Sequence, residues 1–198
     1  RGDVTVKTTR PDDLLSLQIS LAQCGVKVTN GDDWIRVRGD AVKGGTDVVT
    51  APHPGFATDL QPQMLAFLCT APGVSVVEES IFNARFSYVN ELARMGADVK
   101  VSMESNAAVV KGVDQLSGAP VEAPDIRAGA GLVVAGLGAA GETEIIGLEY
   151  IDRGYERLAE TLSELGGQVQ RTSGVTQFVE PSTIFETSEY PRVNTAAG

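Results

Sequence analysis

The sequence is poor in the residues that most often mark a chemical site by themselves. It has one histidine, one tryptophan and two cysteines, Cys24 and Cys69, whose separation matches no metal-binding or redox motif. Both cysteines lie in apolar helical patterns, which predicts buried thiols in a reducing, cytoplasmic compartment. No apolar run approaches the ~18 residues that a membrane-spanning helix requires. These absences exclude a disulfide-rich secreted protein and a transmembrane protein, and nothing in the sequence indicates a metal site.

Basic residues are scarce relative to acidic ones. The 198 residues include 16 Lys and Arg against 26 Asp and Glu, which gives a formal net charge of −10. Because this excess repels phosphate backbones and anionic lipids, we expect neither a nucleic-acid partner nor a membrane partner. The chain also lacks an initial methionine and an apolar leader. We therefore expect it to be part of a longer product.

What the sequence does contain is an internal repeat. Three helical patterns end with a core-facing leucine and, four residues later, a glycine suited to the C-terminal cap, in residues 21–25, 92–96 and 162–166. They recur about every 70 residues, and a second helix is expected at 58–70 and at 125–139. The unit is βαβαββ, so five helices in three units leave the set one helix short. That helix would have to come from sequence outside this chain.

The remaining elements follow from local patterns. Strands are expected at residues 4–7, 74–77 and 144–146, and turns that lead into strands at residues 31–38 and 105–111. The 22 glycines and few aromatic residues suit helices that pack closely on sheets. Residues 172–198 have no sustained periodicity, which predicts an extended or disordered tail after a folded region of residues 1–171.

Three charged residues lie where we expect helices to begin: Asp59, Arg127 and Arg153. A helix N-terminus carries unpaired N–H groups and partial positive charge, so an added arginine can complete a phosphate or carboxylate site. The alternative is structural. Asp59 would then cap its helix, and the two arginines would pair with their neighbours Asp125 and Asp152.

Two further features have a functional and a structural interpretation. Arg85 either holds an anion or pairs with Glu91. The glycines of residues 129–131 and 136–138 resemble phosphate loops only superficially, because they lie inside a helical pattern. Small residues in that position permit close helix packing, which is the interpretation we favour.

Four segments, in order, resemble signatures of the enolpyruvyl transferase family. They are residues 50–61, 81–97, 125–130 and 151–157. The resemblance extends over residues 1–171 and implies an α/β (α+β) fold, an inside-out barrel domain built of three strand-helix units. The family has two such domains. This chain would supply most of one, incomplete by itself, with the remainder of the enzyme as its partner.

The resemblance also implies a reaction. The enolpyruvyl group of phosphoenolpyruvate would be transferred to the 3-hydroxyl of UDP-N-acetylglucosamine, in the synthesis of peptidoglycan precursors. Asp59 would contact the sugar and take its hydroxyl proton, and Ile81 would line the nucleotide-sugar site. Arg127 and Arg153 would bind phosphoenolpyruvate, with Arg85 nearby. No metal and no cofactor is implied.

Two features of the family are missing from this chain. They are a Lys-Asn pair near the N-terminus and a mobile-loop cysteine that donates a proton, a role that neither Cys24 nor Cys69 can inherit. We therefore expect the isolated chain to be inactive. Two alternatives stay open: transfer to another acceptor (shikimate phosphate or a uridine nucleotide), and a non-catalytic homologue that binds a phosphorylated ligand or a partner protein.

Overall fold

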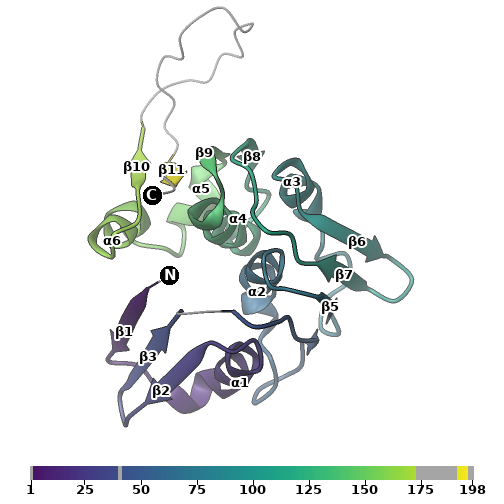
Figure 1. Ribbon diagram of the computed structural model, residues 1–198, viewed down its shortest axis with the longest axis vertical. Coiled ribbons are helices and arrows are strands. Elements are labelled where there is room, and N and C mark those ends of the chain that lie inside the picture. The colour runs from purple at the N-terminus through teal and green to yellow at the C-terminus, as the bar shows by residue number, and fades with distance from the viewer. Residues whose placement is uncertain (1, 40–41, 173–190, 196–198) are drawn as a thin grey trace, which may run out of the picture.

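Three small β-sheets surround two central helices in the computed structural model, which describes residues 2–39, 42–172 and 191–195 (Figure 1). The strands are β1 (Asp3–Lys7), β2 (Lys27–Asn30), β3 (Trp34–Arg38), β4 (Val48–Val49), β5 (Val74–Glu78), β6 (Asp98–Ser102), β7 (Ala107–Lys111), β8 (Pro120–Glu122), β9 (Gly141–Ile146), β10 (Val169–Arg171) and β11 (Pro191–Thr195). The helices are α1 (Leu15–Gln23), α2 (Gln61–Leu68), α3 (Val89–Arg94), α4 (Ile126–Gly138), α5 (Leu148–Asp152) and α6 (Leu158–Glu164), with 3-10 turns η1 (Pro11–Leu14) and η2 (Thr58–Leu60).

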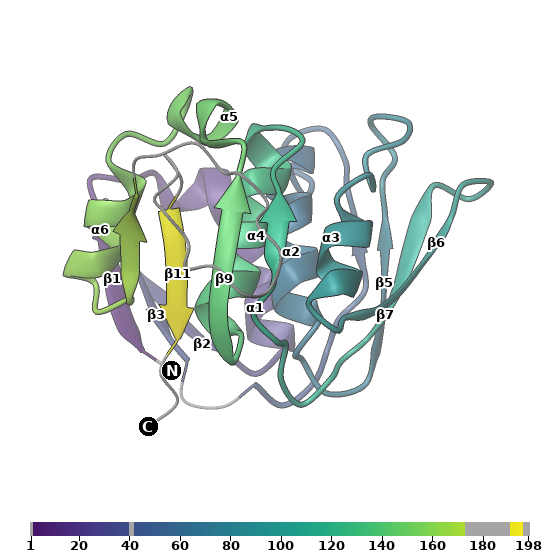
Figure 2. The same cartoon turned by 90° about the horizontal axis from the view of Figure 1, so that it is seen from above.

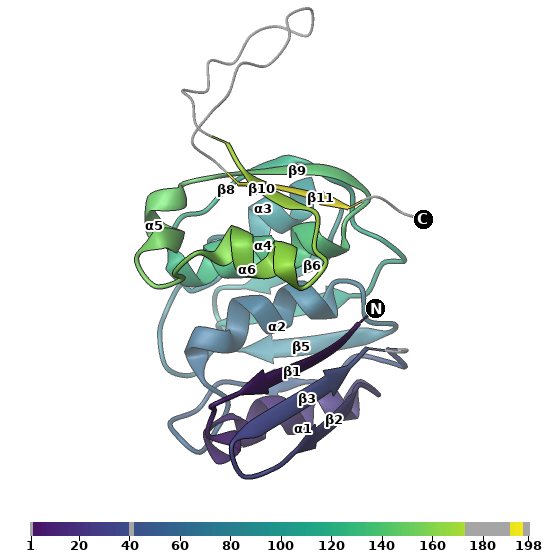
Figure 3. The same cartoon turned by 90° about the vertical axis from the view of Figure 1, so that its left-hand side faces the viewer.

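Each repeat supplies most strands of one sheet, and the first two repeats each add one strand, β4 and β8, to the next sheet. The first sheet has the order β1-β3-β2 and is antiparallel, and the second has the order β4-β5-β7-β6. The third has the order β10-β11-β9-β8, with β8 and β9 parallel, and its strands lie side by side in Figure 2. Helices α2 and α4 lie between the first and third sheets (Figure 3). The α/β architecture predicted from the repeat is therefore confirmed.

The glycines that close the repeated helices confirm the periodicity. Gly25, Gly96 and Gly166 follow α1, α3 and α6, and their φ angles are +86°, +87° and +91°. This left-handed conformation strains residues that carry a β-carbon but costs glycine little. The chain therefore reverses at the same point in each unit and continues as a strand.

Helices α2 and α4 pack closely because small residues face the contact. A β-carbon added at Gly131 would lie 2.9 Å from the carbonyl oxygen of Pro62, and one at Gly129 would lie 2.7 Å from the side chain of Ile151. Leu65 and Leu132 are fully buried beside this contact. Burying a leucine contributes roughly 1.5–3 kcal/mol. The packing interpretation is confirmed for Gly131, which faces α2, and for Gly129, which faces Ile151 of α5, whereas a β-carbon at Gly138 would meet nothing within 4 Å.

One helix start was predicted wrongly. The segment 151–157 was expected to begin a helix, but α5 ends at Asp152, Arg153 follows it, and α6 begins only at Leu158. Gly147, at φ +89°, turns the chain from β9 directly into the short α5. The chain then passes close to α4, where a β-carbon at Gly154 would lie 2.5 Å from Ile126. The helical pattern of residues 151–157 thus reflects the end of α5 and not the start of a helix.

Part of the expected tail takes its place in a sheet. Strand β11 lies between β10 and β9, antiparallel to both. Residues 173–190 and 196–198 lie outside the described residues, so the prediction of an extended or disordered tail is not addressed for them. Within the described part of the chain, no helix is both long and apolar enough to cross a membrane.

Candidate active site

Asp59 lies in the turn η2, immediately before α2, and its side chain is 63% exposed. The residue at the N-cap of η2 is Ala57, and no side chain caps this turn. Capping therefore does not account for Asp59. Its carboxylate is instead available to groups that approach from other elements.

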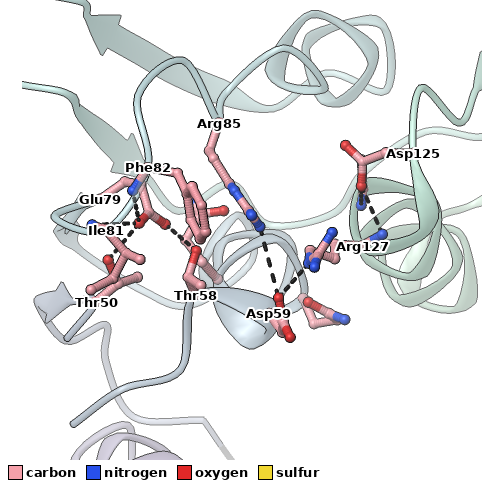
Figure 4. A network of polar contacts seen from close by, with 12 residues as sticks. Thr50, Thr58, Asp59, Glu79, Ile81, Phe82, Arg85, Asp125 and Arg127 are labelled. Atoms are coloured by element: carbon pink, nitrogen blue, oxygen red, sulfur yellow. Dashed lines mark hydrogen bonds and ion pairs between the residues drawn. The ribbon is translucent and has the colours of Figure 1, made fainter. Parts of the chain in front are cut away.

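Two arginines from distant parts of the chain meet this carboxylate. Arg127, in the first turn of α4, donates a hydrogen bond from Nε to Oδ1 of Asp59. Nη1 of Arg85, in the loop that follows β5, lies 3.8 Å from the same oxygen (Figure 4). Neither pairing suggested by sequence proximity occurs for these two arginines, because Asp125 does not pair with the Arg127 side chain and Glu91 pairs with Arg94 at 3.5 Å.

Asp125 has a separate role at the start of α4. Its carboxylate accepts hydrogen bonds from the backbone N–H groups of Arg127 and Ala128, at 2.8 Å and 3.0 Å. Asp125 is therefore the N-cap of α4. The cap occupies N–H groups that an anion at the helix N-terminus would otherwise use. An anion at this end of α4 would depend on the arginine side chains.

The side chain of Arg85 is held in a position that suits anion binding. Its side chain is 19% exposed, and its guanidinium lies over the ring of Phe82, 4.1 Å from the ring centre. The buried Nη1 atom has no hydrogen-bond partner among the described residues. The stacked ring fixes the guanidinium, and Nη1 keeps a donor available on the side of Asp59.

A buried carboxylate that the sequence analysis missed organises the wall beside Asp59. Glu79 is 2% exposed, and its two oxygens accept four hydrogen bonds. The donors are the hydroxyls of Thr50 and Thr58, both at 2.8 Å, and the backbone N–H groups of Ile81 and Phe82, at 2.9 Å and 3.1 Å. We call these five residues the Glu79 cluster (Figure 4).

One signal in the sequence would have identified Glu79. Strand β5 alternates between exposed and buried residues, and Ser75 and Val77 are its inward positions. Glu79 continues that phase, which places an acidic side chain on the inward face. An acid at an inward position requires partners, and the hydroxyl-rich segment around Thr58 offers them.

The two remaining predicted residues differ in their surroundings. Ile81 is 37% exposed, and its backbone N–H is held by Glu79 as part of the Glu79 cluster. Arg153 is exposed and, among the described residues, makes no hydrogen bond or ion pair with the other site residues. Its neighbour Asp152 pairs with Arg171 instead, at 2.6 Å and 2.8 Å. The structure therefore brings together Asp59, Arg85 and Arg127, and leaves Arg153 apart from this contact.

Comparison with known proteins shows the family of this chain. Residues 1–162 match the family model described as EPSP synthase (3-phosphoshikimate 1-carboxyvinyltransferase). The chain belongs to this family of enolpyruvyl transferases. It is 49% identical over 171 residues to a UDP-N-acetylglucosamine 1-carboxyvinyltransferase of Desulfofundulus thermocisternus, covering 86% of this chain and 70% of that protein. It is 44% identical over 174 residues to one of Carboxydothermus hydrogenoformans, covering 88% of this chain and 41% of that protein.

Solved structures show the same enolpyruvyl transferase fold. The enolpyruvyl transferase NikO from Streptomyces tendae matches 83% of this chain with a TM-score of 0.71 and 24% identity, over 39% of its own length. An EPSP synthase from Acinetobacter baumannii matches 98% of this chain with a TM-score of 0.62 and 15% identity, over 42% of its own length. The chain thus spans about two fifths of most of the relatives it matches.

The cysteines of this enolpyruvyl transferase chain are part of its core. Cys24 and Cys69 are fully buried and free of disulfides. Burial raises the pKa of the Cys69 thiol to about 12 and also raises that of Cys24. Because the thiolate is the reactive form, neither cysteine is suited to chemistry near neutral pH. The sequence-based assignment of Cys69 to the core is confirmed.

Proposed function

We propose that the complete protein transfers the enolpyruvyl group of phosphoenolpyruvate to the 3-hydroxyl of UDP-N-acetylglucosamine, and that this chain supplies part of the site for both substrates. The observation that carries the proposal is the meeting of Asp59, Arg85 and Arg127 on three separate segments. Relatives at 43–49% identity named UDP-N-acetylglucosamine 1-carboxyvinyltransferase support this choice of acceptor.

The arginines suit phosphoenolpyruvate. That substrate carries a carboxylate and a phosphate, and a guanidinium binds either group through two parallel hydrogen bonds. Arg127 and Arg85 would approach from α4 and from the loop after β5, and Arg153 would join from the loop after α5 once the substrate is bound. The stacked position of Arg85 on Phe82 limits the side-chain entropy that binding would cost.

Asp59 suits the role of general base. Its carboxylate would take the proton of the sugar hydroxyl as that oxygen forms a bond to C2 of phosphoenolpyruvate. C3 would gain a proton from a group in the remainder of the enzyme. Loss of a proton from C3 and cleavage of the bond between C2 and the phosphate oxygen would then release phosphate and restore the double bond.

The contact between Asp59 and Arg127 links the two substrates. The arginine that would bind the anion holds the carboxylate that would act as base. An anionic substrate would draw Arg127 away from Asp59, and this carboxylate would then be free to accept the sugar proton. Binding of phosphoenolpyruvate and readiness of the base are therefore coupled in this proposal.

The test is phosphate release from phosphoenolpyruvate in the presence of UDP-N-acetylglucosamine. The complete polypeptide should turn over, and the 198-residue chain by itself should not, because part of the site is lacking. Shikimate 3-phosphate and a free uridine nucleotide serve as control acceptors. Faster turnover with either control acceptor would overturn the assignment of the acceptor. Ligand binding by the complete polypeptide without turnover on any acceptor would point to the non-catalytic homologue.

A further inference from the structure

We propose that Glu79 is a positioning residue that sets the geometry of Asp59, Ile81 and Arg85. The inference rests on the proposed function, because it assigns these three residues to the substrate site. Glu79 itself is buried and does not touch the substrate. It acts through the backbone and hydroxyl groups that its carboxylate holds.

The hydrogen bonds of the Glu79 cluster join three segments that are separate in the sequence. Oε1 accepts from Thr50, which follows β4, and from the N–H groups of Ile81 and Phe82 in the loop after β5. Oε2 accepts from Thr58 in η2. One carboxylate therefore ties the end of β4, the turn that carries Asp59 and the loop that carries Arg85.

The burial of Glu79 makes this arrangement specific. A buried carboxylate is costly unless donors replace its lost hydration. Among the described residues no arginine or lysine pairs with Glu79, so hydroxyl and amide donors alone compensate its charge. Each donor must keep its distance and direction, because an unsatisfied buried charge costs more than a lost neutral hydrogen bond. A glutamate in this environment fixes the positions of its donors.

The same loop is held at a second point. Nδ2 of Asn106 donates hydrogen bonds to the backbone oxygens of Glu79 and Phe82, the latter at 2.8 Å. Asn106 precedes β7, which pairs with β5. The loop is thus held from the side of β7 by an amide and from the side of η2 by a carboxylate. Of these two anchors, the carboxylate is the one that reaches the turn of Asp59, through Thr58.

The consequence concerns the distance between η2, which carries Asp59, and the loop after β5, which carries Arg85. Thr58 is the residue next to Asp59, and Ile81 and Phe82 begin the loop that ends at Arg85. Loss of the carboxylate would release η2 from this loop while leaving every site residue present. Misplacement of reacting groups by about 1 Å is enough to lower a rate ~100-fold. The expected defect is therefore one of turnover per folded molecule.

The experiment compares Glu79→Ala, Glu79→Gln and Thr58→Val with Glu78→Gln in the complete polypeptide. Glu78 is exposed and adjacent in sequence, so Glu78→Gln removes the same charge without touching the cluster. We expect kcat to fall at least tenfold in Glu79→Ala and by less in Glu79→Gln, which keeps one acceptor oxygen. Thr58→Val should lower kcat two- to fivefold, and Glu78→Gln should leave it unchanged.

Two measurements separate positioning from stability. Activity is expressed per folded molecule, from circular dichroism at a temperature well below every melting transition. A loss of activity that follows only the unfolded fraction, or a kcat of Glu79→Ala within threefold of that of Glu78→Gln, would overturn the proposal. If Glu79→Ala fails to fold, Glu79→Gln decides by the same criterion.

Amide hydrogen exchange in the complete polypeptide, measured without turnover, keeps the test independent of the proposed function. Exchange at Ile81 and Phe82 should accelerate at least tenfold in Glu79→Ala and remain unchanged in Glu78→Gln. If the complete polypeptide lacks transferase activity while exchange accelerates, the proposed function fails and the anchoring by Glu79 stands. Unchanged exchange in Glu79→Ala would overturn the anchoring itself.

Discussion

Asp59 and Glu79 are two carboxylates with opposite surroundings. Asp59 belongs to the turn η2, and Glu79 accepts a hydrogen bond from Thr58 of the same turn. Asp59 is exposed, and its partners are two guanidinium groups. Glu79 is buried, and its partners are hydroxyl and amide groups. An exposed carboxylate keeps access to ligand and solvent, whereas a buried one gives up that access and gains fixed geometry. The comparison separates a group suited to exchange a proton from a group suited to hold its neighbours in place.

The largest effect should come from removing the basicity of Asp59. In the complete polypeptide, Asp59→Asn should lower kcat by ~100- to 10,000-fold, because an amide can still bond the sugar hydroxyl but cannot take its proton. The affinity for UDP-N-acetylglucosamine should change little. Steady-state kinetics with Asp98→Asn, an exposed aspartate on β6, provide the control. A kcat within threefold of the unmodified protein would remove Asp59 from the chemistry.

Substitution of the arginines assigned to phosphoenolpyruvate should have a smaller effect, which is selective for that ligand. Arg127→Ala and Arg153→Ala should each weaken phosphoenolpyruvate binding by ~1.5–3 kcal/mol, roughly 10- to 150-fold, the cost of a lost charge-assisted hydrogen bond. Binding of UDP-N-acetylglucosamine should be largely kept. Calorimetric titration of both ligands tests this, with Arg94→Ala as the control. Equal weakening of both ligands would leave these arginines a structural role only.

The contact between Asp59 and Arg127 predicts that one substitution tightens phosphoenolpyruvate binding instead of weakening it. Because Asp59 pairs with Arg127, Asp59→Asn should release the guanidinium and tighten phosphoenolpyruvate binding by ~1.4- to 5-fold, the range of an exposed ion pair. Glu79→Gln should give no such gain, since its carboxylate is not paired with an arginine among the described residues. Titration of phosphoenolpyruvate alone distinguishes the two variants. Weaker binding to Asp59→Asn would refute the coupling.

The smallest effect concerns an exposed carboxylate away from the site. Arg171 holds the pKa of Asp152 below its ordinary 3.8. A lowered folded-state pKa stabilises the protein above pH 3.8, and this contribution is lost as the pH falls through the folded value. Asp152→Asn should therefore lower the free energy of unfolding at pH 7 by at most ~1 kcal/mol, with no deficit at low pH. Urea denaturation at both pH values tests the sign.

The repeat could be predicted because its signals are local. A leucine and a glycine four residues apart specify a helix end wherever they occur, and Gly25, Gly96 and Gly166 confirmed it. The helix start expected at residues 151–157 was wrong for the same reason. A charged segment resembles a helix start from its residue types, whereas the real boundary depends on the approach of Gly154 to Ile126.

The partners within the site could not be predicted in this way. Asp59 and Arg127 are 68 residues apart, and their contact exists because α2 and α4 pack together. Glu79 was missed because its hydroxyl donors lie 21 and 29 residues earlier in the chain. Such pairings depend on tertiary packing, which composition and spacing do not specify.

The close approach of Gly131 to Pro62 limits which residues can occupy position 131. Gly131 lies one turn after Arg127 on the same side of α4, and the backbone of α2 leaves no room for a β-carbon there. A single methyl group at Gly131 would push α4 outward and carry the guanidinium of Arg127 away from Asp59. A substitution at Gly131, a residue with no charge and no place among the proposed substrate-binding residues, would thus lower the activity. Position 131 would therefore tolerate little variation, although a list of substrate-contacting residues would not include it.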